Sequence, residues 1–344
     1  MSNMKAAVWT ATDQVEVAAV AMPEVPEGWA LVRVAYNGIC GTDLAILHGK
    51  HPRATGPLIM GHEISGWVER AGATGPAAGT LVVVEPLITC GQCRSCKSGL
   101  THVCRNLGLY GIDSPGGMAQ YVALPPEVLH AVPDGVDPRT ASLAEPLAVA
   151  VHAVGLSDLQ AGSTVAVYGA GPIGILTALV ARHAGAGTIV ITEPSPYRRE
   201  VAAQFGFTVV PAGSSMAATL EPLTDGEGAD VTFDSAAHPS VAAELTAVTR
   251  VRGRIVIVGV YKQPAALDLQ AVCFKEQTIV GIRVYTSGDV TSAIELLASG
   301  VLGLDRFPTR AFDLTDVAAA FEAATSGQQC LKVLLTPLSG MADR

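Results

Sequence analysis

A run of closely spaced glycines after an apolar segment constrains this 344-residue chain more than any other feature. The segment STVAVYGAGPIG, residues 163–174, places Gly169, Gly171 and Gly174 in the pattern G-x-G-x-x-G between a predicted strand and a predicted helix. The first glycine permits a sharp turn, the second lets a pyrophosphate approach the backbone, and the third lets the helix pack on the strand. The sequence therefore predicts a dinucleotide-binding turn, in which Pro172 and Ile173 begin the helix that faces the phosphates.

A carboxylate at the end of the next predicted strand supports this interpretation. Glu193 follows Gly174 by 19 residues, where it can accept hydrogen bonds from both ribose hydroxyls. Because a carboxylate at this position repels a 2′-phosphate, it favours NAD over NADP. Arg198 and Arg199 follow closely and could receive a 2′-phosphate. We interpret the two arginines as a solvated helix face, and keep Arg198 among the candidate cofactor-binding residues.

Strands and helices alternate from about residue 147 onward. This alternation predicts an α/β fold, a doubly wound parallel sheet with helices on both faces. The expected strands cover residues 188–193, 230–236, 254–260 and 278–285, and the expected helices cover 172–185, 197–206 and 287–302, before a strand-like tail at 330–337. The first half of the chain instead shows short extended runs separated by turn residues, which predicts a β-rich domain without defining its topology.

Charge and the N-terminal sequence limit the partners and the compartment. A net charge of −9 with no Lys/Arg run argues against binding to nucleic acid or to an anionic membrane surface. The N-terminus lacks the pattern of a signal peptide, which predicts a cytoplasmic protein. The apolar stretch from Leu159 to Arg182 is long enough to suggest a membrane span, but GAGPIG in its middle divides it into a strand, a turn and a helix.

Four of the seven cysteines lie within residues 90–104. Their spacing is C-x2-C-x2-C-x7-C, which is typical of a metal site. In a reducing compartment, four thiolates this close together form a closed tetrahedral zinc site with a structural role. Two disulfides and an iron–sulfur cluster are the alternatives, and neither suits the compartment or the spacing as well. The predicted ligands are Cys90, Cys93, Cys96 and Cys104.

Scattered residues could form a second metal site with an open position. The segment GICGTD contains Cys40, MGHEISG contains His62 and Glu63, and LAEPLAVAVHAV contains Glu145. A thiolate, an imidazole and a carboxylate can hold zinc and still leave room for water or an alcohol. Each residue also has a plain structural interpretation, as a core cysteine, a turn histidine or a carboxylate at a helix N-terminus. The sequence alone does not show that they meet.

Taken together and in this order, the motifs resemble the zinc-dependent medium-chain dehydrogenases, the alcohol dehydrogenase family. The resemblance rests on GICGTD, on GHEISG with a glycine six residues after Gly66, on the four-cysteine segment, on AEPLAVAVHAV and on GAGPIG. It implies a GroES-like catalytic domain built from residues 1–148 and 287–344, with a zinc lobe at about 85–115, and a Rossmann domain over 149–286. It also implies two zinc ions per chain, one catalytic and one structural, and a homodimer or homotetramer.

The same resemblance implies roles for individual residues. The catalytic zinc ligands would be Cys40, His62 and Glu63, with Glu145 binding directly or through the metal's water. The zinc would act as a Lewis acid on the substrate hydroxyl, and the nicotinamide would accept the hydride. The hydroxyl of Thr42 would begin the proton path out of the site.

Residues close to Cys40 in the sequence have more than one possible role. Asp43 would either orient the ligands or cap a turn. Many relatives carry a histidine five residues after the ligand cysteine, where this chain has Ala45. His48 or His51 could replace that histidine, or the proton could leave through water.

The segments EPLAV, TEPSPYRREVAAQFG and GVYKQPAALDLQAVCFKEQTIVG look most like the (R,R)-butanediol and polyol dehydrogenases. This branch implies NAD-linked oxidation of a secondary hydroxyl of a vicinal diol or polyol to a ketone. Sorbitol, cyclitols and threonine are alternative substrates. A nucleotide-binding sensor without activity is an alternative from a different class, although a sensor would not need the open metal site at Cys40, His62 and Glu63. A zinc-ribbon interaction module would not explain the Rossmann half.

Overall fold

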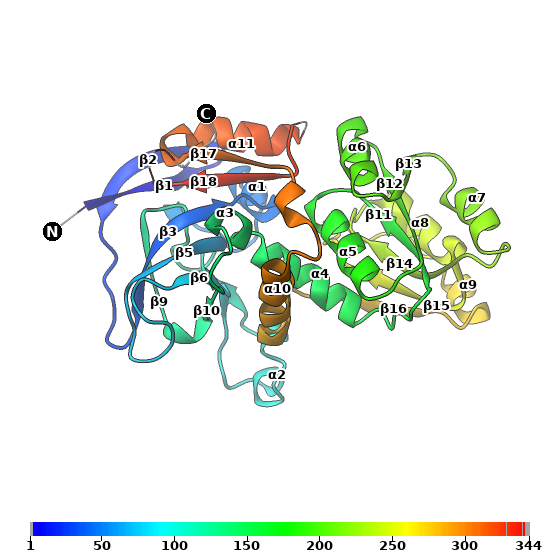
Figure 1. Cartoon of the computed structure of the whole chain (residues 1–344), viewed down its shortest axis with the longest axis horizontal. Coiled ribbons are helices and arrows are strands. Elements are labelled where there is room, and N and C mark those ends of the chain that lie inside the picture. Colours follow the sequence, from blue (N-terminus) through cyan, green and yellow to red (C-terminus); the bar gives the residue numbers. More distant parts are fainter. Residues whose placement is uncertain (1–2, 328, 339, 341–344) are drawn as a thin grey trace. The chain divides into compact units, whose positions relative to one another are not determined.

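The computed structural model describes residues 3–327, 329–338 and 340, and it divides the chain into two compact units (Figure 1). The first unit consists of Met1–Glu145 together with Thr286–Arg344, and we call it the split unit. The second unit consists of Pro146–Tyr285, and we call it the inserted unit.

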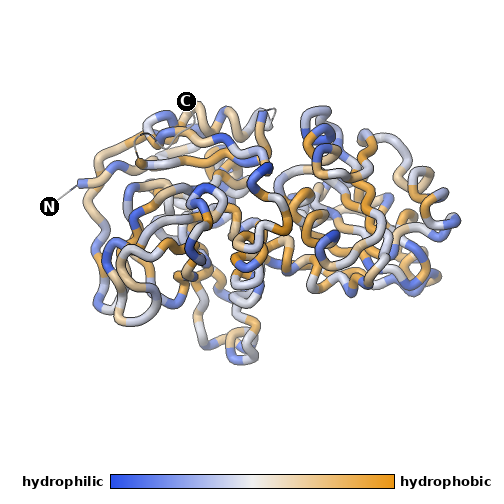
Figure 2. The backbone as a smooth tube through the Cα atoms, viewed as in Figure 1, coloured by the Kyte–Doolittle hydropathy of each residue, from blue (hydrophilic) through white to orange (hydrophobic). Residues whose placement is uncertain are grey.

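Six parallel strands form the sheet of the inserted unit, in the order β13-β12-β11-β14-β15-β16. This is the order 3-2-1-4-5-6 of the Rossmann fold, so the predicted doubly wound sheet is confirmed. Figure 2 shows apolar residues along its central strands, as expected for strands that helices cover on both faces. The strands are β11 (Thr164–Tyr168), β12 (Thr188–Glu193), β13 (Thr208–Pro211), β14 (Ala229–Asp234), β15 (Thr249–Ile257) and β16 (Thr278–Gly281).

The helices of this unit follow the strands. They are α5 (Pro172–His183), α6 (Pro196–Gln204), α7 (Met216–Leu220), α8 (Pro239–Val248) and α9 (Leu269–Phe274). The last expected strand, 278–285, is too long, since β16 ends at Gly281. Val284 adopts a left-handed φ of 43°, which a strand cannot include.

The split unit is β-rich, as its sequence predicts. Its largest sheet has the order β10-β6-β5-β3-β18-β17, with β9 also paired to β3. The elements of this sheet are β3 (Ala30–Gly38), β5 (Glu63–Arg70), β6 (Leu81–Val84), β9 (Tyr121–Leu124), β10 (Leu129–Ala131), β17 (Thr309–Asp313) and β18 (Lys332–Thr336). Strand β18 pairs antiparallel with β3 and parallel with β17, so the two sequence segments of this unit share one sheet.

The split unit also contains a smaller sheet, the lobe and several helices. A second sheet consists of β1 (Asn3–Ala11), β2 (Gln14–Ala21) and β4 (Leu58–Ile59), and the lobe carries β7 (Leu87–Ile88), β8 (Gly108–Leu109) and α2 (Arg94–Lys97). The other α-helices of this unit are α1 (Gly41–Leu47), α3 (Pro138–Ala141), α10 (Ser287–Ser299) and α11 (Val317–Ser326). Helix α4 (Ala144–Gly155) starts at the end of the first segment of the split unit and continues into the inserted unit.

The apolar stretch that could suggest a membrane span becomes β11, the glycine-rich turn and α5. No helix in the described part of the chain combines the length and apolar composition that crossing a membrane requires.

Candidate metal centres and cofactor site

The four cysteines of the lobe gather around one point. The sulfurs of Cys93 and Cys96 are 3.5 Å apart, as are those of Cys90 and Cys104, while those of Cys93 and Cys104 are 4.0 Å apart. A zinc ion with Zn–S bonds of about 2.3 Å requires sulfurs about 3.8 Å apart in a tetrahedron. All seven cysteines are free thiols, which excludes the two-disulfide alternative. The sulfur positions therefore fit a structural zinc ion.

The protonation of these thiols also fits a metal. The backbone N–H groups of Arg105 and Cys96 lower the pKa of Cys93 to about 6. Burial and the neighbouring sulfurs raise the pKa of Cys96 to about 12. Four thiolates can therefore coexist here only when a cation offsets their charge, and this is the charge that Zn²⁺ supplies.

Strand pairing assembles the second candidate metal centre. Strand β3 pairs with β5 in a register that places Gly38 opposite Glu63, the first residue of β5. Cys40 follows β3 as the N-cap of α1, and His62 directly precedes β5. The ligand atoms of Cys40, His62 and Glu63 lie within 4.8 Å of one another. The structure thus brings together three residues that the sequence could only name separately.

A buried lysine completes this centre, and the sequence analysis missed it. The Lys332 ammonium donates a hydrogen bond of 2.5 Å to Glu63 Oε1 and also pairs with Oε2. The two side chains are 4% and 1% exposed, respectively. Lys332 begins β18, on the side of β3 opposite to β5. No local motif marks this lysine, because only the strand order brings it to Glu63.

Gly38 makes room for that ion pair between the two neighbouring strands. A Cβ atom at this position would lie 1.9 Å from Glu63 Oε2 and 2.8 Å from Lys332 Cε. Any larger residue would therefore displace one of the paired side chains.

Asp43 lies beside His62 in the interior. Its Oδ2 accepts a hydrogen bond of 2.8 Å from the Cys40 N–H, which closes a capping box at the start of α1. Its Oδ1 lies 3.7 Å from His62 Nδ1, and both atoms are buried without a hydrogen-bond partner among the described residues. Asp43 thus both caps the helix and faces the imidazole, which combines the two alternatives from the sequence.

The electrostatics favour a cation in this centre. Burial opposes charging of the His62 imidazole, but Asp43, Cys40 and Glu145 raise its pKa well above the ordinary value. Burial likewise opposes the Lys332 charge, and Glu63 and Cys40 outweigh it, so the pKa of Lys332 is raised. The anionic ligands therefore attract positive charge, which fits a divalent metal held by Cys40, His62 and Glu63.

Glu145 takes a different position from the other predicted ligands. It lies in the first turn of α4, and it is not part of the three-residue group whose ligand atoms lie within 4.8 Å. Its charge nevertheless raises the pKa of both His62 and Lys332. The Glu145 carboxylate therefore influences the protonation of His62 and Lys332 through its electric field.

The residues near the proposed proton path occupy distinct environments. The Thr42 hydroxyl lies 3.8 Å from Cys40 Sγ. Ala45 lies within α1 and offers no proton-exchanging group. His48 Nδ1 is 2.6 Å from Asp13 Oδ1 and is occupied by that pair. His51 Nδ1 accepts the backbone N–H of Ala54, and burial and Arg53 lower the pKa of its imidazole.

The glycine-rich turn has the geometry that its sequence predicts. Gly169 adopts a φ of +98°, which favours glycine. A Cβ at Gly174 would lie 1.9 Å from the Gly169 carbonyl oxygen, so only glycine permits this approach of α5 to β11. A Cβ at Gly171 would have Arg198 Nη1 as its nearest neighbour, at 3.6 Å. Pro172 and Ile173 begin α5 as expected.

Glu193 and the two arginines differ in part from expectation. Glu193 is 3% exposed, and its oxygens accept the N–H groups of Ala170 (2.7 Å) and Ser195 (2.9 Å). Each oxygen keeps a second lone pair with which it can accept a ribose hydroxyl. The solvated face expected for the arginines is wrong, because Arg199 Nη1 donates to the Glu193 and Pro194 carbonyl oxygens.

Arg198 is also drawn inward. Its Nε is buried without a hydrogen-bond partner among the described residues, and its Nη1 faces Gly171. A buried guanidinium nitrogen without a partner beside a phosphate-binding turn fits a nucleotide that would complete its hydrogen bonding.

Comparison with known proteins agrees with this arrangement. Residues 26–134 match the alcohol dehydrogenase GroES-like domain, and residues 172–299 match the zinc-binding dehydrogenase family. The chain is 40% identical, over 88% of its length and 89% of the relative, to 2-dehydro-3-deoxy-L-galactonate 5-dehydrogenase from Pseudoalteromonas atlantica.

Two solved structures are also similar. The first is a zinc-binding dehydrogenase from Sinorhizobium meliloti 1021 bound to NADP, with a TM-score of 0.91, 32% identity, and coverage of 98% of this chain and 100% of that one. The second is 2R,3R-butanediol dehydrogenase from Bacillus subtilis, with a TM-score of 0.90, 30% identity, and coverage of 97% and 100%.

Proposed function

The chain belongs to the zinc-containing medium-chain alcohol dehydrogenases and is a zinc-dependent NAD(P) dehydrogenase that acts on a hydroxyl substrate. From this premise we propose that it oxidises a secondary hydroxyl flanked by a second hydroxyl, in a polyol or sugar acid, to a ketone with NAD. The observation that carries this proposal is the Cys40–His62–Glu63 centre in a chain 40% identical to a sugar-acid 5-dehydrogenase.

The relatives' names support the substrate class. One acts at carbon 5 of 2-dehydro-3-deoxy-L-galactonate, and another acts on 2R,3R-butanediol. Both reactions oxidise a secondary carbinol whose neighbouring carbon carries a further hydroxyl. A neighbouring hydroxyl gives the substrate a second polar group. The Glu145 carboxylate, which lies outside the Cys40–His62–Glu63 group, could accept a hydrogen bond from that hydroxyl. The higher identity favours a sugar acid over a simple diol.

The chain's own residues take the following roles. Cys40, His62 and Glu63 would hold the zinc ion, and Lys332 would offset the Glu63 charge. When bound, zinc polarises a substrate oxygen as a Lewis acid. Asp43 orients the His62 ring. We assign the first proton transfer to the Thr42 hydroxyl, and a bridging position to Glu145, which would contact the metal directly or through water.

NAD is the proposed cofactor, although one relative's structure contains NADP. The buried Glu193 carboxylate at the end of β12 would repel a 2′-phosphate. Arg199 is held by two backbone carbonyls, so Arg198 is the remaining cation of the pair at this turn. The turn from Gly169 to Gly174 would bind the pyrophosphate.

Two assays test this function. Formation of NADH or NADPH is measured with NAD and NADP in parallel. The substrates are 2-dehydro-3-deoxy-L-galactonate, butanediol isomers, sorbitol, a cyclitol, threonine and 2-propanol. We expect the highest kcat/KM for a substrate with adjacent hydroxyls. Preference for threonine or for a simple alcohol would overturn the substrate class, and turnover of none of them by zinc-loaded protein would overturn the proposed substrate range.

The cofactor choice has its own variant. Glu193→Gln removes the repelling charge, so we expect the preference for NAD over NADP to fall about tenfold or more. The matched control is Glu200→Gln, an exposed residue of α6. An unchanged preference in Glu193→Gln would contradict this role.

We also propose that the enzyme is a homo-oligomer of the cytoplasm. Three exposed apolar side chains support self-association: Val260 (86% exposed), Leu269 (69%) and Phe274 (79%), which come from a short stretch of the inserted unit that precedes the edge strand β16. Sedimentation of wild type and of Phe274→Asp tests this, because the substitution should dissociate the assembly. Free thiols in both metal centres suit a reducing compartment.

A further inference from the structure

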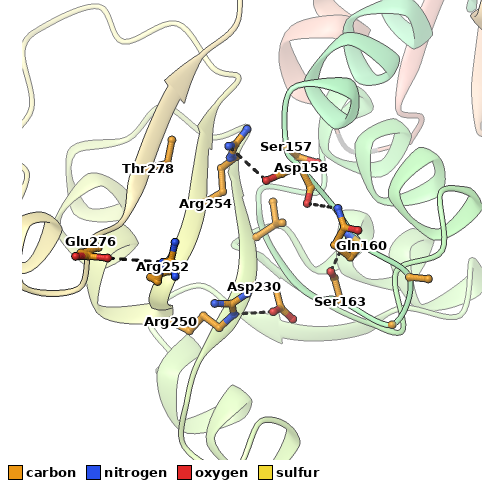
Figure 3. Close-up of a pocket in the computed structure, with 13 residues that line it drawn as sticks. Ser157, Asp158, Gln160, Ser163, Asp230, Arg250, Arg252, Arg254, Glu276 and Thr278 are labelled. Carbon is orange, nitrogen blue, oxygen red and sulfur yellow. Dashed lines mark hydrogen bonds and ion pairs between the residues drawn. The ribbon is translucent and has the colours of Figure 1, made fainter.

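Residues 250–254 read Arg-Val-Arg-Gly-Arg, and the three arginines line one cavity of about 620 Å³ in the inserted unit (Figure 3). The arginines come from β15, and Figure 3 shows Asp158, Gln160 and Ser163 across the cavity from them. The dehydrogenase function makes no use of this cluster.

The cavity lies away from the cofactor turn. Ser163 directly precedes β11 and Thr278 begins β16, so the cavity lies at the edge where the parallel strands begin. Gly169 follows the other end of β11. Six residue steps of about 3.3 Å each along that strand separate Ser163 from Gly169 by roughly 20 Å.

The three arginines are held with different strength. Arg250 Nε donates to Asp230 Oδ1 at 2.6 Å and is fixed. Arg254 Nη2 lies 3.6 Å from Asp158, and Arg252 Nε lies 3.6 Å from Glu276, both beyond hydrogen-bond distance. The Arg252 and Glu276 side chains are also 77% and 75% exposed, and such pairs contribute little. Arg254 Nη1 donates a hydrogen bond of 2.9 Å to the Leu156 carbonyl oxygen, which holds the guanidinium but leaves its charge. Arg252 and Arg254 can therefore bind another anion without breaking a hydrogen bond to a carboxylate.

The backbone around the cavity is strained at charged residues. Asp158, Arg252 and Glu276 adopt left-handed φ angles of 56°, 57° and 47°. These conformations are costly for residues other than glycine, and they are commonly associated with binding sites. All three line this one cavity.

We propose that this cavity binds an oxyanion with two or more negative charges, a phosphate or a multivalent carboxylate. The guanidinium forks of Arg252 and Arg254 match such oxygens in pairs. Asp230 offsets the charge of Arg250, so Arg250 shapes the wall of the cavity, and the Ser163 and Thr278 hydroxyls and the Gln160 amide line the same cavity as neutral groups. The cavity volume lies within the range of small-ligand sites.

Calorimetric titration of the zinc-loaded enzyme, saturated with NAD so that the pyrophosphate site is filled, tests this proposal. The probes are inorganic phosphate and tricarballylate, with acetate at equal ionic strength as the monovalent control. We expect saturable binding of one of the two multivalent anions. Arg252→Gln and Arg254→Gln should each weaken it about tenfold. Arg283→Gln, an exposed arginine of the same unit outside the cavity, should leave it unchanged.

A variant that removes a negative charge from the cavity should raise the affinity for the anion. Glu276→Gln frees Arg252 from its carboxylate, so we expect the anion to bind several-fold more tightly, whereas the exposed control Glu227→Gln should have no effect. Binding to phosphate alone or to tricarballylate alone identifies the oxyanion. Absence of saturable binding, or equal binding by the Arg252→Gln/Arg254→Gln double variant with an unchanged melting temperature, would overturn the proposal.

Discussion

The lobe takes all four of its ligands from residues 90–104, whereas the Cys40–His62–Glu63 centre depends on strands that lie far apart in the sequence. Helix α2 of the lobe buries none of its residues, so this helix adds no core packing to the support that the sulfur ligands give. The second centre is fixed by the pairing of β3 with β5 and β18, and its carboxylate is paired with Lys332, 269 residues later.

This difference separates two uses of a metal. In the lobe, the metal supplies the contacts that a small segment cannot obtain from a core. In the second centre, the sheet holds the ligands in place and an ion pair neutralises one of them, so the metal is needed for chemistry and much less for folding. The variants below test this contrast.

Cys96→Ser should have the largest effect on structure. Structural zinc contributes on the order of 10 kcal/mol of folding free energy, so the lobe should lose its zinc and unfold locally. Zinc analysis and hydrogen exchange of residues 90–104 measure this, with the exposed Cys273→Ser as control. A fully protected lobe in Cys96→Ser would show that sulfur ligation is not what holds it.

Cys40→Ala should abolish activity while sparing the fold. Loss of the Lewis acid removes several kcal/mol of transition-state stabilisation, which corresponds to at least about 1000-fold in kcat/KM. The thermal unfolding midpoint should change little, since β3 and β5 remain paired. A drop in stability as large as that of Cys96→Ser would remove the proposed contrast between the centres.

Lys332→Met should weaken both activity and stability. It leaves the Glu63 carboxylate buried without its cation, at a cost of about 3–5 kcal/mol of folding free energy. As a partner of a ligand, Lys332 should also lower kcat/KM about 10- to 100-fold when it is replaced. Lys332→Met/Glu63→Gln should regain stability but not activity, and denaturant unfolding with steady-state kinetics measures both. If the double variant is no more stable than Lys332→Met, the unpaired Glu63 carboxylate is not what destabilises Lys332→Met.

Gly38→Ala should have the smallest effect. The new methyl group would contact Glu63 and Lys332, and such overpacking costs about 1–3 kcal/mol. Gly41→Ala is the matched control, because a Cβ there meets no atom within 4 Å. Equal unfolding midpoints for the two variants would contradict the space-making role of Gly38.

The sequence predicted the parts of the fold whose signal is local. Strand β12 matches its expected range, and β11 and α5 follow the glycine pattern, because buried parallel strands and glycine turns leave contiguous marks. The pairing of β18 with β3 was not predictable, since strand order depends on contacts across the whole split unit. The early end of β16 depends on one left-handed residue, Val284, that no pattern indicates.

The candidate sites divide in the same way. The cysteine spacing at 90–104 contains the whole lobe site, and the sulfur distances agree with it. Lys332 has no neighbouring motif. Gly38 opens the segment GICGTD, but its role in making room for the ion pair becomes visible only when three strands lie side by side. The arginines after Glu193 looked like a surface pair, but hydrogen bonds to backbone carbonyls fix Arg199 and the glycine turn faces Arg198.

The position of β18 between β3 and β17 has a consequence during synthesis. The ribosome makes Glu63 269 residues before Lys332, which at about 5–20 residues per second takes roughly 15 to 50 s. During that interval the carboxylate has no ammonium partner, and Cys40, His62 and Glu63 form only a half-finished centre. The whole inserted unit is translated before the lysine arrives. The metal centre can therefore be completed only after strand β18, which carries Lys332, has been synthesised and has paired with β3.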